Sequence, residues 1–230
     1  MFAIITGASR GIGKELAYKF ASHNYDLLLT CENNINELTN VENDIESKFG
    51  KKVIIKKGLI EENELPNDAY ILINNAGKCD YNLLQDVDYD RYKEIVYSNL
   101  DYTFLTTKLV SKVMLKNKQG IIVNISSMWG ILGSAMESVY SMTKGGINAF
   151  TKSLAKEFKD SNVDVIAFAL GAVDTDMNSH LSEIERADFL KTLDEGKMFT
   201  ASEVADKIYD IVFARKYKTG DIIEINNGLT

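Results

Sequence analysis

Short apolar runs alternate with longer amphipathic stretches along almost the whole of this 230-residue chain. Two of the runs, residues 120–125 and 163–168, are nearly all apolar, as a strand buried on both faces of a sheet requires. Such alternation is typical of βαβ units, in which helices cover a parallel sheet. The sequence therefore predicts an α/β fold, a doubly wound parallel sheet of about seven strands with helices on both faces.

The same pattern predicts where each element lies. Strands are expected over 2–6, 25–31, 52–58, 70–74, 120–126, 163–169 and 221–226, and helices over 12–22, 35–49, 88–118, 139–160 and 201–214. We find no linker-like segment and no repeat at a fixed period. One domain over residues 1–230 is expected.

Charge and cysteine content exclude several classes of function. The net charge is −7, with both signs interspersed, so the surface should repel nucleic acid. The two cysteines form no C-x-x-C motif and histidines do not cluster, so neither a disulfide framework nor a metal site is predicted. Without a signal-peptide pattern or an apolar run of about 18 residues, we expect a cytoplasmic protein with no membrane span.

A glycine-rich turn directly follows the first predicted strand and leads into a helix. Its glycines have the spacing Gly-x-x-x-Gly-x-Gly from residue 7. Glycines let the backbone approach a ligand closely, and the helix N-terminus offers unpaired N–H groups to a pyrophosphate. The turn therefore predicts a dinucleotide site in a Rossmann-like sheet, lined by Gly7, Ser9, Arg10, Gly11, Ile12 and Gly13.

This turn and four later motifs resemble the short-chain dehydrogenase/reductase family. Asn-Asn-Ala-Gly ends a predicted strand at 74–77, Ser-Asn-Leu contains Asn99, and Ser127 precedes a Tyr-x-x-x-Lys motif, Tyr140 and Lys144, by thirteen residues. Residues 219–228 resemble the family's last strand. The resemblance spans essentially the whole chain, and its overall pattern is most similar to the 3-oxoacyl-acyl-carrier-protein reductases.

The resemblance implies an NAD(P)(H)-dependent oxidoreductase that interconverts a carbonyl and a secondary alcohol by hydride transfer. Tyr140 would be the general acid/base, and Ser127 would bind the substrate oxygen. Lys144 would bind the nicotinamide ribose, and Asn99 would continue a proton relay. Further cofactor contacts are implied at Asn75, Ala76, Gly77, Val173 and Thr175.

Tyr-x-x-x-Lys occurs twice, so the motif alone discriminates poorly. Tyr89 and Lys93 stand at a probable helix start, where the simplest interpretation is an exposed i,i+4 pair. Tyr140 and Lys144 instead follow a buried strand. Lowering the pKa of a tyrosine by roughly three units requires about 4 kcal/mol. We therefore expect a partly dehydrated site in which the lysine charge and a cationic oxidised nicotinamide together stabilise the phenolate.

The choice between the two nicotinamide cofactors depends on the end of the second strand. NAD-using members of the family usually carry an acid there, where this chain has Cys31 followed by Glu32. Arg10 resembles the basic residue that members using the phosphorylated cofactor place beside the 2′-phosphate. NADP(H) is therefore favoured over NAD(H), although Glu32 opposes it.

Three departures from the family pattern are visible. Gly58-Leu59 replaces an acidic or amide residue, so adenine contact at Leu59 would come from the backbone. The segment between the third strand and Asn74 is short, which leaves little room for a helix. Leu170-Gly171 replaces the usual Pro-Gly.

Three alternatives stay open or are disfavoured. A 3-oxoacyl-acyl-carrier-protein reductase has partial support from the basic residues Lys116 and Lys118. A non-catalytic NADP-sensing protein is a second alternative. A sugar-nucleotide epimerase is disfavoured because only about 55 residues follow Thr175, too few for a substrate domain.

Assembly is expected from two long helices that pack between subunits in relatives. Their apolar residues exceed what one sheet face needs, which predicts a homodimer or homotetramer. These residues include Leu105, Leu109, Val113, Phe150 and Leu154.

Overall fold

A computed structural model describes residues 1–178 and 182–229, and its centre is a parallel sheet of seven strands. The strand order is β3-β2-β1-β4-β5-β6-β9, and every pairing is parallel. This confirms the predicted fold class and all seven predicted strands. Their bounds are β1 Phe2–Ile5, β2 Asp26–Cys31, β3 Val53–Lys57, β4 Ala69–Asn74, β5 Gly120–Ser127, β6 Val163–Leu170 and β9 Ile222–Ile225.

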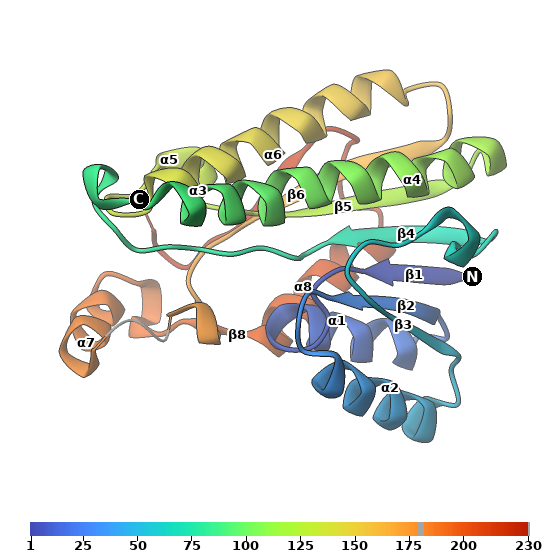
Figure 1. Cartoon of the computed structure of the whole chain (residues 1–230), viewed down its shortest axis with the longest axis horizontal. Coiled ribbons are helices and arrows are strands. Elements are labelled where there is room, and N and C mark those ends of the chain that lie inside the picture. Colours follow the sequence, from blue (N-terminus) through green and yellow to red (C-terminus); the bar gives the residue numbers. More distant parts are fainter. Residues whose placement is uncertain (179–181, 230) are drawn as a thin grey trace.

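Helices cover both faces of this sheet (Figure 1). One face carries α1 (Gly11–Ser22), α2 (Ile35–Phe49) and α8 (Ala201–Phe213), and the other carries α3 (Tyr89–Val96), α4 (Tyr102–Asn117) and α6 (Ser138–Glu157). Separate hydrophobic clusters fill the two spaces between helices and sheet. β5 is buried along its whole length and β6 almost so, which explains their apolar sequences.

The long helix predicted over 88–118 is interrupted, which corrects the expectation of one continuous helix. A π-helical segment, Tyr97–Asp101, separates α3 from α4. It buries the polar residues Ser98 and Asn99. Such segments are frequent at functional sites, and here Asn99 donates to the Thr143 hydroxyl on α6 at 2.9 Å.

Several short elements were not predicted. α5 (Trp129–Leu132) follows β5. Further along the chain, β7 (Val173–Asp174) pairs with β8 (Phe199–Thr200), and α7 (Glu183–Lys191) lies between them in sequence. Between β3 and β4 the described chain contains only one 3-10 turn, Glu62–Glu64. The prediction that this segment has little room for a helix is confirmed.

The strand order reverses between β1 and β4. In an open parallel sheet, a crevice forms at the carboxyl ends of the strands at such a point. The glycine-rich turn follows β1 and Asn-Asn-Ala-Gly ends β4, so the topology brings the two motifs to one place.

Candidate active site

The turn after β1 has the backbone conformation that its glycines were expected to provide. Gly7 and Gly11 have positive φ angles of 67° and 55°. A Cβ on Gly13 would lie 2.3 Å from the carbonyl oxygen of Gly7, so only glycine allows α1 to begin this close to the turn. No acidic side chain stands in the first turn of α1, which leaves its N-terminal N–H groups suited to an anion.

Asn-Asn-Ala-Gly is joined to this turn by hydrogen bonds. The Asn75 side chain donates to the carbonyl oxygens of Thr6 at 3.0 Å and Gly7 at 3.1 Å. The hydroxyl of Thr6 accepts from the backbone N–H groups of Asn75 and Ala76, both at 3.0 Å. Asn75 therefore builds the turn with its side-chain amide, in addition to lining the cleft beside it.

A cleft of about 770 Å³ lies over these motifs. That volume suits a small-molecule or cofactor site. Most residues predicted to bind a cofactor line it, from five separate parts of the chain. They are Gly7, Ser9, Arg10, Gly11, Ile12, Glu32, Leu59, Asn75, Ala76, Gly77 and Thr175.

The predicted nicotinamide end is formed from the segment after β6. Val173 is buried in β7, and the Thr175 methyl would lie 3.7 Å from a Cβ built on Gly11. At Gly171, which follows Leu170 in place of the usual Pro-Gly, a Cβ would lie 2.4 Å from the Asn227 side-chain oxygen. Close packing against Asn227 therefore accounts for the retained glycine.

The three residues predicted to act on a substrate meet between β5 and α6. Ser127 is the last residue of β5, and Tyr140 and Lys144 lie one turn apart on α6. All three are buried, and Tyr140 is 8% exposed. The Lys144 ammonium lies 5.6 Å from the centre of the Tyr140 ring and donates to the Ile125 carbonyl oxygen at 2.7 Å.

The dehydrated setting expected around Tyr140 is present, but its effect on the tyrosine is opposite to the one required. Burial raises the pKa of Tyr140 above its ordinary value, and the nearby Cys79 thiol and Glu137 carboxylate add to the rise. The hydrogen bond with Ser127 acts against them. The expected stabilisation of the phenolate involves both the Lys144 charge and a cationic oxidised nicotinamide, and in the chain by itself the Lys144 ammonium donates to the Ile125 carbonyl.

Burial also changes the pKa of Lys144. Loss of solvation lowers its pKa to about 8, so its charge is held less firmly than that of an exposed lysine. A Cβ added to Gly77 would lie 3.5 Å from the Lys144 nitrogen. Gly77 lines the cleft, so the cleft comes close to Lys144 on α6 at this position.

The Asn99 side chain is fully engaged in hydrogen bonds with two other segments of the chain. Its oxygen accepts from the Lys78 N–H at 2.7 Å, and its nitrogen donates to the Lys78 carbonyl at 2.9 Å and to the Thr143 hydroxyl at 2.9 Å. It therefore connects the loop after β4 to α6, beside Lys144. Asn99 lies in the π-helical segment.

The second Tyr-x-x-x-Lys motif lies on the surface, as expected. Tyr89 is 69% exposed, and Lys93 forms an ion pair with Asp90 at 2.6 Å. Neither residue lines the cleft. Tyr89 and Lys93 thus form a solvated pair.

Sequence reasoning missed several residues around the cleft. The Tyr102 hydroxyl donates to the Gly58 carbonyl and accepts from the Thr30 hydroxyl, both at 2.8 Å, so it occupies the backbone carbonyl beside Leu59. Near Tyr140, the Cys79 thiol donates to the Glu137 carboxylate at 2.9 Å. The residues in each of these hydrogen-bonded pairs are at least 44 positions apart in the chain, so no local motif predicts the contacts.

Comparison with known proteins identifies the class to which this fold and site belong. The family model of the short chain dehydrogenases matches residues 1–186, and the chain belongs to that family. It is an oxidoreductase of the kind that binds NAD(P) and acts on small molecules.

Relatives of full length support the same class. The chain is 34% identical to the 3-oxoacyl-[acyl-carrier-protein] reductase FabG of Aquifex aeolicus, over 99% of this chain and 96% of that protein. It is 32% identical to the uncharacterized oxidoreductase YmfI of Bacillus subtilis, over 98% and 97%.

Solved structures share the fold at lower identity. A proposed NAD(P)-dependent gluconate 5-dehydrogenase from Beutenbergia cavernae, with bound NADP at low occupancy, superposes with a TM-score of 0.88 at 23% identity over 98% of this chain and 94% of its own. YwfH, an NADPH-dependent reductase involved in bacilysin biosynthesis, gives 0.88 at 20% identity over 99% and 97%.

The described residues contain no group of three or more His, Cys, Asp or Glu side chains placed to hold a metal ion. No helix in this part of the chain combines the length and the apolar character that crossing a bilayer requires.

Proposed function

We propose that this protein reduces a small-molecule ketone to a secondary alcohol with NADPH, or catalyses the reverse reaction, and that Tyr140 transfers the proton. The observation that carries the proposal is the meeting of Ser127, Tyr140 and Lys144 beside a cleft built on a glycine-rich turn. The chain would function as one domain.

Each residue has a separate task in this proposal. The Ser127 hydroxyl holds the substrate oxygen, which orients the carbonyl for protonation by Tyr140. Lys144 stabilises the phenolate that remains and binds the nicotinamide ribose, and Asn99 keeps the loop at Lys78 in place and continues the proton relay. A bound nicotinamide cofactor supplies or accepts the hydride.

The glycines give the independent sign that a dinucleotide fits. A Cβ on Gly7 would lie 2.9 Å from the Ala76 Cα, and one on Gly13 would block the turn. These two glycines allow the tight turn and the close start of α1, the geometry that presents a helix N-terminus to a phosphate group. Gly7, Ser9, Arg10, Gly11, Ile12 and Gly13 would hold the pyrophosphate and adenosine half, and Val173 and Thr175 the nicotinamide amide.

We propose NADP(H) rather than NAD(H) as the working cofactor. Arg10 projects at the edge of the cleft, where it pairs with Asp176 at 3.0 Å and is exposed enough to exchange that partner for a phosphate. The two solved structures at similar TM-score were described with NADP or as NADPH-dependent, which supports the same choice.

The experiment is a screen of NADPH oxidation over diketones, acyl thioesters, quinones and sugars. We expect at least one ketone to be reduced, and faster with NADPH than with NADH. An acyl-carrier-protein thioester as the best substrate would favour the narrower function of the FabG relatives. NADPH binding without turnover on any of these classes would favour a sensing protein and contradict the proposal.

We also propose that the protein assembles through α4 and α6, which lie side by side on one face (Figure 1). Phe104 and Leu105 are 49% and 37% exposed there, and the rings of Phe104 and Phe150 lie 6.4 Å apart across the two helices. Leu154, expected to contribute, is instead buried in the protein's own core.

Light scattering at micromolar concentration should therefore report a dimer or tetramer. Phe104→Asp should shift the population toward monomer, because a carboxylate would be desolvated in an apolar interface. Lys112→Asp, an exposed change on the same helix outside the aromatic pair, is the control. A monomer in the unmodified protein would refute the assembly.

A further inference from the structure

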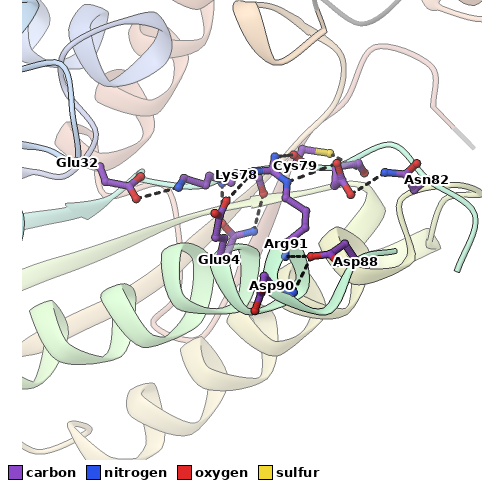
Figure 2. A network of polar contacts seen from close by, with 10 residues as sticks. Glu32, Lys78, Cys79, Asn82, Asp88, Asp90, Arg91 and Glu94 are labelled. Atoms are coloured by element: carbon purple, nitrogen blue, oxygen red, sulfur yellow. Dashed lines mark hydrogen bonds and ion pairs between the residues drawn. The ribbon is translucent and has the colours of Figure 1, made fainter. Parts of the chain in front are cut away.

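An ion pair crosses the cleft at the adenosine end. Lys78 lies in the loop after β4, and Glu32 follows β2, 46 residues earlier in the chain. Figure 2 shows the Lys78 side chain extended toward Glu32, and its ammonium lies 2.8 Å from the carboxylate. Both residues line the cleft.

The backbone of Lys78 is fixed by hydrogen bonds. Asn99 binds its backbone N–H and its carbonyl at 2.7 and 2.9 Å. The ammonium, in contrast, is at the end of a flexible four-carbon stem and is partly exposed. Lys78 can therefore change its anion partner without any movement of the backbone that carries it.

Two other cations line the cleft, and each pairs with acidic partners other than Glu32. Arg91 donates to the Cys79 carbonyl at 2.7 Å and pairs with Asp80 and Glu94 (Figure 2). Arg10 pairs with Asp176. Of the three cations, Lys78 is the one that reaches the end of β2.

The presence of Glu32 makes the position of Lys78 important for binding a 2′-phosphate. An acidic residue at the end of β2 lies where a dinucleotide places its adenosine ribose, and alone it would repel a 2′-phosphate. With Lys78 beside it, the local charge is close to zero. A phosphate carries more charge than a carboxylate and offers more acceptor atoms, so it is the stronger partner for an ammonium.

We propose that Lys78 is a specificity-determining residue: its ammonium separates from Glu32 and binds the 2′-phosphate of NADP(H). The inference deepens the proposed function and rests on its nicotinamide cofactor. It explains how a chain with a glutamate after β2 would still accept the phosphorylated cofactor. In the cofactor-free protein, Glu32 would then hold the Lys78 side chain in position.

Calorimetric titration with two adenosine nucleotides isolates this contact. Adenosine 2′,5′-bisphosphate and adenosine 5′-monophosphate differ only in the 2′-phosphate, and neither requires turnover. The unmodified protein should bind the bisphosphate more tightly. Lys78→Met should weaken bisphosphate binding about tenfold and change monophosphate binding less than about twofold. Glu32→Gln should strengthen bisphosphate binding, and Lys78→Arg should retain most of it.

The matched control is Lys93→Met, which removes one cation from an ion pair outside the cleft and changes the net charge equally. It should leave the ratio of the two affinities unchanged. An unchanged ratio in Lys78→Met, or equal weakening of both nucleotides, would overturn the proposal for Lys78. Equal binding of both nucleotides by the unmodified protein would instead overturn the NADP(H) preference and this proposal with it, whereas ketone reduction with NADH would still support the oxidoreductase.

Discussion

Replacing Tyr140 with Phe should lower turnover on a substrate found in the screen by at least about a hundredfold, the usual contribution of a general acid. The substitution removes the hydroxyl and keeps the ring, so the packing between α6 and β5 should survive. NADPH affinity should change little, because the lost hydroxyl serves the substrate. Steady-state kinetics and an NADPH titration on the same preparation measure both quantities.

Tyr89→Phe is the matched control for this experiment. It makes the same chemical change in the second Tyr-x-x-x-Lys motif, on a side chain that is 69% exposed. Its kinetics should equal those of the unmodified protein. Near-normal turnover in Tyr140→Phe, or inactivity in Tyr89→Phe, would show that the catalytic centre is wrongly assigned even if the fold is right.

Lys144→Ala should lose turnover by at least about a hundredfold and should also weaken NADPH binding by about tenfold. Two losses are expected because Lys144 is proposed to stabilise the phenolate and to bind the ribose. The equivalent change Lys93→Ala on the surface pair should cause neither. A variant that loses only turnover, with unchanged NADPH affinity, would remove the ribose contact from the mechanism.

The pH dependence of the unmodified protein provides a second test of Lys144. Burial lowers the pKa of Lys144 to about 8, so the group is charged below that pH and neutral above it. Because we propose that the charged form stabilises the phenolate, the rate of reduction should decline as the pH rises through about 8. A rate that stays constant across that range would contradict this role.

Most of the architecture could be predicted because it follows from hydrophobic period and glycine placement. All seven strands of the main sheet are where apolar runs predicted them. The break in the 88–118 helix could not be predicted, since a π-helical segment leaves the helical character of the sequence intact and differs only by one inserted residue per turn. α7 was missed because none of its residues is buried, so no apolar face marks it.

The candidate site divides in the same way. Motifs whose members are close in sequence, such as the turn from Gly7 to Gly13 and the pair Tyr140 and Lys144, could be located directly. Contacts between distant segments could not, and the Lys78–Glu32 pair is the main example. The raised pKa of Tyr140 also needed the structure, because it depends on burial and on Cys79, 61 residues away in the chain.

Transfer of deuterium from 4-deuterated NADPH to the product alcohol tests the proposed chemistry most directly. The ketone from the screen is incubated with the protein and each labelled form of the cofactor in turn, and the alcohol is analysed by mass spectrometry. We predict that one of the two forms delivers its deuterium to the carbinol carbon, and that Tyr140→Phe abolishes most of this product. Tight NADPH binding with no deuterium in any alcohol would contradict hydride transfer and leave a protein that binds the cofactor without using it.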